Sequence, residues 1–315
     1  MPLDSQLTPN SFSSFVGQNR VKARLEMAIA AAKSRNETLG HILLVGSPGA
    51  GKATLAQIIA KAMGRVIKST SGPAIVSAPD LAGLLTNLEE GDVLFIDEIH
   101  RLTRSIGEHL PQPMKDFTLD IIIDQGPNSR KVRLNLPRFT LIGVATRQER
   151  ISRDLLSAFP IVESMSPYSN EELGDIARRF AVALKFEIDD VAAARIACSA
   201  DGTPLDVLNR LRHVRDYAHV RYSSERITMD IATESLNLLS SAEPKKESDN
   251  ARQAIPSEIR REVWRRDGGK CVKCSSREKL EYDHIIPLAK GGSNTARNIE
   301  LLCESCNRSK SDSIQ

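Results

Sequence analysis

The sequence lacks the long apolar run that a membrane-spanning helix needs. Its apolar stretches, such as Ile42–Val45 and Val93–Ile96, have the length of buried strands, well below the roughly 18 to 20 residues that cross a bilayer. The first twenty residues also lack a secretory signal, so we expect a cytoplasmic protein with no membrane partner. Aromatic residues make up only 4% of the chain, against 41% hydrophobic and 26% charged residues. This balance excludes a disordered or fibrous chain and predicts an aliphatic core.

Cysteine is scarce, and its placement is informative. Four of the five cysteines form two CxxC steps separated by 28 residues near the end of the chain: Cys271, Cys274, Cys303 and Cys306. In a chain without a secretory signal, such paired steps favour one tetrahedral structural Zn²⁺ over disulfides. We expect the fifth, Cys198, to be a small buried residue of a helix.

A strong charge of one sign is also lacking. The 315 residues carry a net charge of +3, but residues 251–315 hold 13 Lys and Arg against 9 Asp and Glu. This local basic excess indicates a polyanionic partner such as DNA for the last part of the chain alone. At roughly 150 residues per domain, the length suggests about two domains.

Three structured regions and a linker follow from the patterns along the chain. Short Val-, Ile- and Leu-rich runs alternate with helical patterns up to Pro167, which predicts an α/β region with a parallel sheet. The next region has a helical pattern throughout, with a capping box at Ser169 and Glu172 and a break at 202–204. The polar stretch 240–254 predicts a linker. We assign residues 1–167 to the core, 168–240 to a helical lid, 241–255 to the linker and 256–315 to a small C-terminal domain.

A glycine-rich loop stands between a strand-like run and the helical run 53–63. Backbone N–H groups of such a loop bind phosphates at a helix N-terminus, and the following lysine reaches the β- and γ-phosphates. The loop contributes Gly46, Pro48, Gly49, Gly51 and Lys52. A second apolar strand ends in Asp97, which suits Mg²⁺, and Glu98, which suits the polarisation of an attacking water. The two elements together predict a site for ATP.

Several stretches resemble the RuvB family of AAA+ ring motors, which drive branch migration of Holliday junctions. They are residues 15–18, the phosphate loop, 71–74, 85–101 and 139–143. The resemblance extends from about Ser11 to Leu239. It implies a P-loop parallel sheet with a helical lid, DNA as a partner, and assembly of several copies of the chain.

The same resemblance assigns further residues. It puts Thr146 at the family's sensor-1 position and Tyr168 near its adenine contact. Residues 116–123 and 130–134, joined by a turn at Gly126–Pro127, resemble the hairpin that meets a RuvA-like junction-binding partner.

The chain departs from the family pattern at three groups that act on the γ-phosphate. Ala53 stands where a Ser or Thr hydroxyl binds Mg²⁺, and Thr54 points about 100° around the helix. Leu156 and Ala158 stand where the family has two arginines, one of them the arginine finger, which is worth about 10³ to 10⁵ in rate. Leu205 replaces the sensor-2 arginine. We therefore expect ATP binding through Lys52 and the loop, without efficient hydrolysis.

The C-terminal domain carries a second candidate active site between its CxxC steps. Asp283 and Asn307 offer oxygen ligands to a hard divalent ion such as Mg²⁺, and His284 suits a general base for phosphodiester hydrolysis. Residues 265–274, 280–287, 291–294, 298–302 and 303–310 resemble the HNH endonucleases of the ββα-metal, His-Me finger fold. That resemblance implies that Asn298 orients the histidine.

Basic residues flank this candidate site. They are Arg260, Arg261, Arg265, Arg266, Arg308 and Lys310. An arginine cluster is often only a solvated face, but beside a nuclease site we favour contacts with DNA phosphates. The sequence thus predicts a metal-dependent DNA endonuclease fused to a degenerate RuvB-like ATP-binding module. The alternatives are an active branch-migration helicase, or a non-catalytic, ATP-gated DNA-binding adaptor.

Overall fold

The computed structural model describes residues 7–123, 130–242, 255–286, 293 and 295–311. The chain divides into two compact units, Met1–Leu239 and Ser240–Gln315. Within the described ranges, no helix combines the length and the apolar character that a membrane span requires.

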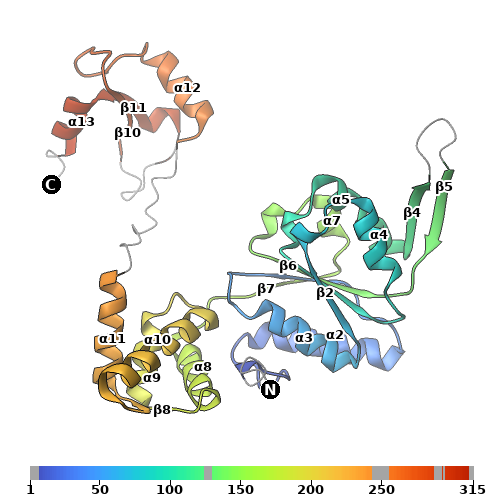
Figure 1. Ribbon diagram of the computed structural model, residues 1–315. Coiled ribbons are helices and arrows are strands. Elements are labelled where there is room, and N and C mark those ends of the chain that lie inside the picture. The colour runs from blue at the N-terminus through green and yellow to red at the C-terminus, as the bar shows by residue number, and fades with distance from the viewer. Residues whose placement is uncertain (1–6, 124–129, 243–254, 287–292, 294, 312–315) are drawn as a thin grey trace. The chain divides into compact units, whose positions relative to one another are not determined.

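The first unit is built on a five-stranded parallel sheet (Figure 1). In spatial order its strands are β2 (Ile67–Ser71), β3 (Val93–Asp97), β6 (Thr140–Ala145), β1 (Ile42–Val45) and β7 (Ile161–Ser164). This confirms the predicted parallel sheet. The carboxyl ends of β1, β3 and β6 lie side by side at one edge, which is where open sheets of this kind bind ligands.

Alternate strand residues pack into two separate cores. On β1, Ile42 and Leu44 join one core, whereas Leu43 and Val45 join the other, because successive side chains point to opposite faces. The first face is covered by α2 (Asn19–Arg35) and α3 (Lys52–Met63), and the second by α4 (Ala78–Thr86), α5 (Arg104–His109), α6 (Pro111–Asp116) and α7 (Arg153–Ser157) (Figure 1). Both faces are buried, which explains the continuously apolar strands.

One histidine is buried in this unit. Nδ1 of His41 accepts the N–H of Leu141 at 2.8 Å, so the ring hydrogen is on Nε2, which donates to the carbonyl oxygen of Met114 at 2.7 Å. Burial lowers the pKa of His41, against an opposing contribution from the bond to Met114. The fold therefore holds this side chain as a neutral, fully bonded imidazole.

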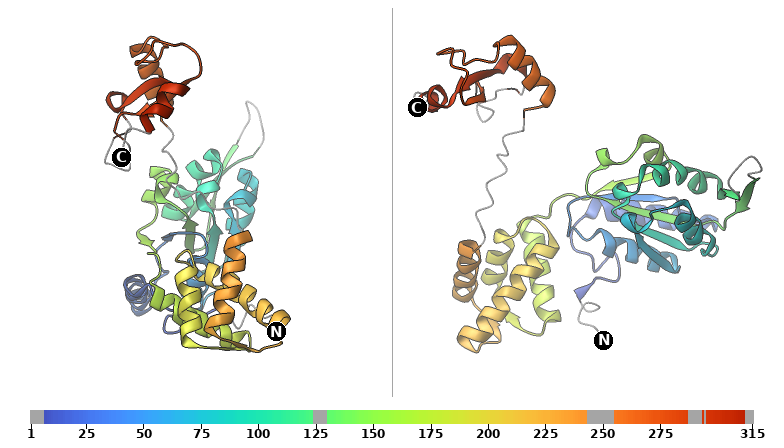
Figure 2. Two further views of the ribbon diagram at one scale, coloured as in Figure 1. Left: turned by 90° about the vertical axis from the view of Figure 1, so that its left-hand side faces the viewer. Right: turned by 45° about the horizontal axis from the view of Figure 1, so that its top comes forward.

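A two-stranded antiparallel hairpin extends away from the sheet (Figure 1; Figure 2). Its strands are β4 (Thr118–Ile123) and β5 (Arg130–Asn135), close to the predicted ranges. Arg133 on β5 donates to Asp120 on β4 at 2.8 Å. The expected turn at Gly126–Pro127 lies outside the described residues.

The remainder of the first unit is a helical lid. Its helices are α8 (Asn170–Ala183), α9 (Asp190–Ser199), α10 (Pro204–Tyr222) and α11 (Met229–Ala242). Both hydrogen bonds of the predicted capping box, between Ser169 and Glu172, are present at the start of α8. The helical structure is interrupted at Gly202, where φ is +74°. The next helix, α10, begins after Thr203, whose hydroxyl oxygen accepts the N–H of Asp206.

Two expectations for the lid were incomplete or wrong. The region is not purely helical, because β8 (Glu187–Ile188) pairs in parallel with β9 (Arg226–Ile227). Cys198 is exposed, although we expected it to be buried. On α9 the buried positions are Ala192, Ala193, Ile196 and Ala197, and residue 198 falls just beyond that face.

The second unit is a small α/β domain (Figure 2). It contains α12 (Ser257–Arg266), β10 (Leu280–His284), the short 3-10 helix η5 (Ala296–Asn298), β11 (Ile299–Cys303) and α13 (Glu304–Ser311). β10 and β11 form an antiparallel pair in which Asp283 faces Glu300. The apolar core is small, since one cluster has only Val263, Ile299 and Leu301 fully buried.

Candidate functional sites

The phosphate loop joins β1 to α3. Gly49 and Gly51 have φ of +77° and +91°, a region that residues with a Cβ avoid. A Cβ on Gly51 would lie 3.1 Å from Cζ of Phe15, so packing also requires glycine there. Because α3 starts at Lys52, its first N–H groups have no partners within the helix and open onto the loop. This is a ready-made site for an anion.

Lys52 is directed into the loop. Its side chain is largely buried, and Nζ donates to the carbonyl oxygens of Gly46 and Ser47, at 2.7 Å each. Burial lowers the pKa of Lys52, while the charge of Asp97 opposes the change. Lys52 and Asp97 therefore line the same cavity, although the hydrogen bonds of Lys52 go to the loop.

The acidic residues at the end of β3 line a cavity that Lys52 also lines. Asp97 is the last residue of β3 and accepts the N–H of Glu98 at 2.8 Å. Glu98 forms an ion pair with Arg101 at 2.9 Å. Thr146 directly follows the neighbouring strand β6, and all three predicted residues line one cavity with Lys52.

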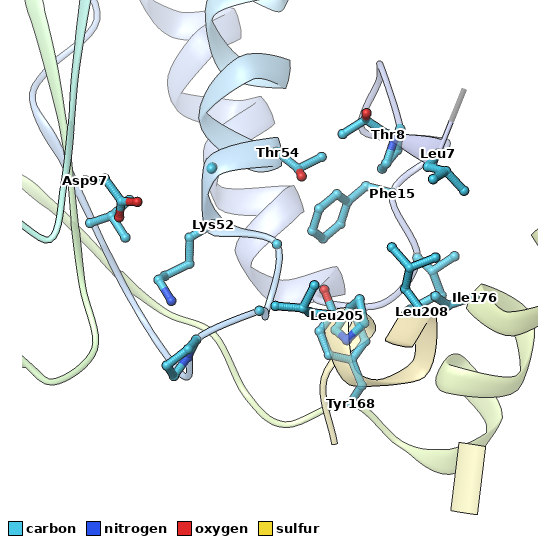
Figure 3. Close-up of a pocket in the computed structure, with 18 of the residues that line it drawn as sticks. Leu7, Thr8, Phe15, Lys52, Thr54, Asp97, Tyr168, Ile176, Leu205 and Leu208 are labelled. Carbon is cyan, nitrogen blue, oxygen red and sulfur yellow. The ribbon is translucent and has the colours of Figure 1, made fainter. Parts of the chain in front are cut away.

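The cavity has a volume of about 780 Å³ and is lined by the sheet edge, the phosphate loop and the lid (Figure 3). Its apolar end contains Phe15, Ile176 and Leu208, and its opposite end contains Lys52. The hydroxyl of Tyr168 donates to the carbonyl of Ala50 at 3.0 Å, and burial raises the pKa of that phenol. An apolar end and a cationic end suit the base and the phosphates of a nucleotide.

The hydroxyl required for Mg²⁺ is missing from the phosphate end. Ala53 lines the cavity but has no ligand atom. Thr54 points toward Phe15 and Thr8, on the opposite side from Asp97 (Figure 3). Thr54 is therefore not placed to act with Asp97.

Apolar residues occupy the positions of the expected arginines. Leu205 packs against the phosphate loop, and its N–H donates to the carbonyl oxygen of Gly49 at 3.4 Å. A Cβ placed on Gly49 would lie only 2.6 Å from Cβ of Leu205. Leu156 packs against the second core, and Ala158 is buried in it. None of these three residues carries a charge toward a phosphate.

His100 is a cavity residue that the sequence did not reveal. It lines the cavity two residues after Glu98, and its Nδ1 is buried with no hydrogen-bond partner among the described residues. Burial lowers the pKa of His100, the charge of Glu98 raises it, and Arg150 lowers it. The position of His100 in the cavity depends on the turn that begins at Glu98, where φ is +48°. No residue spacing in the sequence indicates that turn.

The four C-terminal cysteines meet at one point of the second unit. The Sγ atoms of Cys271, Cys274, Cys303 and Cys306 lie within 4.8 Å of one another. Tetrahedral Zn²⁺ with Zn–S bonds of about 2.3 Å separates its sulfurs by roughly 3.8 Å, so the donor set fits. Bonding to Ser305 lowers the pKa of Cys303 to about 6, while Cys303 raises the pKa of Cys306 to about 12. Four crowded thiols with opposed shifts are a group that a cation would stabilise as thiolates.

The predicted nuclease residues lie in the same unit as this cluster. Asp283 and His284 end β10, and Asn307 follows Cys306 on α13. Nδ2 of Asn307 donates to Oε2 of Glu281 at 2.7 Å, which turns the amide oxygen away from Glu281. Glu281 and Asp283 share one face of the strand, because they are two residues apart. Sequence reasoning missed Glu281, although its spacing from Asp283 was a usable signal.

Asn298 holds the segment that follows His284. It is buried, with Oδ1 accepting the N–H of Ile286 at 2.9 Å and Nδ2 donating to the carbonyls of Ile286 and Ser293. The backbone carbonyl of Asn298 also accepts the N–H of Ile285 at 2.8 Å. These bonds fix the backbone after His284.

The basic residues separate into two groups. Arg260, Arg261 and Arg265 line one surface hollow. Arg266 instead donates to Asp267 at 2.6 Å and to the carbonyls of Ala296 and Ile299, so its guanidinium stabilises the domain itself. Arg308 and Lys310 lie on α13, and their side chains are outside the described part of the structure.

The first unit, with its phosphate loop, acidic strand end and helical lid, is a P-loop AAA+ module. Three family models match the chain: the Holliday junction DNA helicase RuvB P-loop domain over residues 7–165, the RuvB AAA lid domain over 168–241, and HNH endonuclease over 271–313. The chain thus belongs to the RuvB family and carries an HNH endonuclease domain at its C-terminus.

Solved structures agree with the RuvB part of this assignment. The Thermotoga maritima RuvB Holliday junction branch migration motor is 40% identical, with a TM-score of 0.68 over 75% of this chain and 74% of that one. A Thermotoga maritima RuvB variant with one arginine changed to alanine is 31% identical, with a TM-score of 0.69 over 98% of this chain and 99% of that one.

Proposed function

We propose that this protein is a metal-dependent DNA endonuclease in which a RuvB-like module binds ATP without efficient hydrolysis. The observation that carries the nuclease assignment is the position of Asn307, next to a cysteine of the four-thiol cluster and bonded to the strand that bears Asp283 and His284. We propose the module boundaries as 1–167, 168–240 and 256–315, with 241–255 as the linker.

The residues of the second unit divide the work of hydrolysis. Asp283 and the amide oxygen of Asn307 would hold Mg²⁺ or a similar ion, which supplies stabilisation of charge on the phosphate. Glu281 orients Asn307 through its hydrogen bond. His284 takes a proton from the attacking water as general base. Asn298 holds the backbone that follows His284, which supports its role as a positioning residue.

The four cysteines support a structural role for Zn²⁺. Four thiolates fill a tetrahedral shell and leave no position for water. The zinc site therefore stabilises the domain and takes no part in the chemistry.

In the first unit, Lys52, the loop N–H groups, Asp97 and Thr146 support ATP binding, and Tyr168 closes the side of the cavity near the loop. Glu98 is retained as the residue that polarises water. Ala53, Leu205 and the apolar residues at the finger positions argue against fast turnover. Without an arginine finger, a neighbouring subunit does not sense the nucleotide, so we expect any ring to be weak or insensitive to ATP.

We also propose that the RuvB-like unit directs the nuclease to DNA junctions or to a RuvA-like junction-binding partner. The hairpin of β4 and β5 supports this, because it stands out from the sheet and is available for docking (Figure 1). The guided nuclease would then cut DNA close to the junction.

One cleavage experiment tests the proposal. Supercoiled plasmid and a synthetic four-way junction are incubated with the full chain, with and without Mg²⁺ and ATP. We expect cleavage to require both Mg²⁺ and His284. The amount of ATP hydrolysed should not increase with the number of DNA strands cut. Cleavage that persists unchanged in His284→Ala would refute the assignment.

A further inference from the structure

The chain has a single tryptophan, and it lies half exposed on the second unit. Trp264 on α12 is 48% exposed. The apolar core around it is small, so burying this large ring would have stabilised the domain considerably. An exposed tryptophan in an otherwise aromatic-poor protein is therefore a feature that needs a function.

The indole ring is held in a fixed position. Gly268 and Gly269 follow α12 with φ of +64° and +63°, and the N–H of Gly269 donates to the carbonyl of Trp264 at 3.1 Å. A Cβ on Gly269 would lie 3.0 Å from Cζ2 and 3.3 Å from Nε1 of Trp264. The glycine backbone thus packs directly on the ring and leaves room for no side chain. A ring fixed in this way loses little entropy when a ligand covers its exposed part.

Positive charge surrounds the ring on the same face of the helix. Ser257, Arg260, Arg261, Trp264 and Arg265 occupy the i, i+3, i+4, i+7 and i+8 positions of α12 and line one hollow of about 550 Å³. Glu258 and Glu262 fall outside this set of positions. The hollow therefore combines an aromatic surface with three guanidinium groups.

The strand that bears the candidate general base also contributes to the hollow. Tyr282 on β10 completes its lining. Tyr282 and His284 are two residues apart on one strand, so both side chains leave the same face, about 7 Å apart along the strand. A DNA strand bound in the hollow would have phosphates within a few nucleotides of His284.

We propose that this hollow binds single-stranded DNA, with an unpaired base stacked on Trp264 and the neighbouring phosphates bound by Arg260, Arg261 and Arg265. The inference rests on the proposed nuclease function and refines its substrate: DNA with an unpaired segment beside the cut. In an intact duplex the π-faces of the bases are covered by their neighbours, so duplex offers phosphates but no face to Trp264. Arginines beside an aromatic ring match a single strand, where stacking is worth more than base-edge contacts.

The experiment uses the fluorescence of Trp264, the only tryptophan in the chain, as a direct readout. The full zinc-loaded chain, without Mg²⁺ so that no DNA is cut, is titrated with oligothymidylate and with a duplex of equal phosphate number at one salt concentration. We expect single-stranded DNA to quench the fluorescence strongly and the duplex to leave it nearly unchanged. Strong binding of single-stranded DNA, measured by anisotropy of labelled DNA, with no change in fluorescence would overturn the inference.

Variants separate stacking from folding and from charge. Trp264→Leu keeps apolar bulk but lacks a π-face, and we expect it to lower single-strand affinity about 5- to 100-fold while duplex affinity changes less than about twofold. Trp264→Phe should retain most of the single-strand affinity. Val272→Ala removes another exposed apolar side chain of this unit and serves as the matched control. Retained zinc shows that each variant is folded, and an equal loss for both DNA forms would overturn the inference.

This test and the test of the nuclease fail in different ways. A chain that cuts DNA normally after Trp264→Leu, on single-stranded and duplex substrates alike, refutes the stacking site and leaves the nuclease intact. A chain whose tryptophan is quenched by single-stranded DNA, but which cuts no DNA with Mg²⁺, keeps the stacking site and refutes the nuclease.

Discussion

The two units differ in how their folds are stabilised and in how complete their candidate active sites are. Residues 7–239 bury two aliphatic cores, one on each face of the sheet. Among the described residues of the second unit, one buried apolar cluster has three residues and another includes Cys271 and Cys303. The first unit thus buries far more apolar surface than the second, and domains with so small a core often depend on a metal.

The two units differ in the opposite sense in how many of their expected active-site residues are present. The large unit has a cavity lined by Lys52 and Asp97, but apolar residues stand where the family pattern has a hydroxyl and arginines. The small unit has all the residues of the proposed nuclease site: Asp283 and His284 lie between the two CxxC steps, and Asn307 directly follows Cys306. Under the proposed function, the large unit binds ATP and positions the DNA, while the small unit carries out the hydrolysis.

Removing zinc should have the largest effect and should be confined to one unit. In Cys303→Ser, residues 255–311 should lose their fixed fold, because a structural Zn²⁺ contributes about 10 to 16 kcal/mol in small zinc domains. Metal analysis and the loss of dispersed NMR signals from this unit are the measurements. ATP binding should remain, since the nucleotide cavity has its own core.

The matched control is Cys198→Ser, which changes an exposed cysteine of the first unit. It should retain about one Zn²⁺ per chain, the count for four thiolate ligands. If thiol titration of the native chain finds all four clustered cysteines reactive, the zinc site does not exist.

His284→Ala should have the next largest effect, on rate alone. Loss of the general base should slow DNA cleavage about 10²- to 10⁴-fold, while zinc content and DNA affinity are unchanged. Asp283→Ala and Asn307→Ala act through the metal, so raised Mg²⁺ or Mn²⁺ should rescue them in part but should not rescue His284→Ala. Equal rescue of all three variants would contradict the separate roles assigned here.

Ala53→Thr tests the incomplete site of the large unit. The new hydroxyl lies at the start of α3 and should raise ATP turnover roughly tenfold, or about 1.4 kcal/mol of barrier, while the missing arginines keep it slow. Thr54→Ala is the matched control and should change nothing, because Thr54 points away from Asp97 (Figure 3). Fast turnover by the unaltered chain, abolished by Lys52→Ala, would show that the site is not degenerate.

Much of the fold was predictable from local signals. The strands around the phosphate loop follow from continuous apolar runs, and the start of α8 follows from the capping box at Ser169. The lid was harder, because β8 and β9 are two residues each and arise only when distant segments meet. The prediction for Cys198 was wrong because successive residues of a helix are about 100° apart around its axis. A single position therefore decides whether a side chain is buried or exposed.

The site residues were predictable by type but not by partner. Sequence spacing identified Lys52, Asp97, Asp283 and the cysteines as candidates. It did not reveal that Glu281 bonds Asn307 or that Arg266 bonds backbone carbonyls. These contacts depend on which strand face meets which helix, and sequence separation does not encode that.

The smallest expected effect concerns the pH dependence of the first unit. Burial lowers the pKa of His41, whose usual value is 6.5. Because the folded state holds the neutral ring, the contribution of His41 to stability is fully present above about pH 6.5, and it decreases as the pH falls toward the lowered folded value. The decrease is at most about 1.4 kcal/mol per pH unit.

Thermal unfolding of the first unit, followed by circular dichroism between pH 7.5 and 5.5, measures this dependence. His41→Gln replaces the ring by an amide that does not titrate, so it should be less stable at neutral pH and should lose part of the acid sensitivity. His109→Gln, which changes an exposed histidine, should keep the slope of the parent. If His41→Gln also keeps that slope, the acid sensitivity comes from other groups. The buried imidazole would then be a packing residue whose protonation has no part in the stability of the ATP-binding unit.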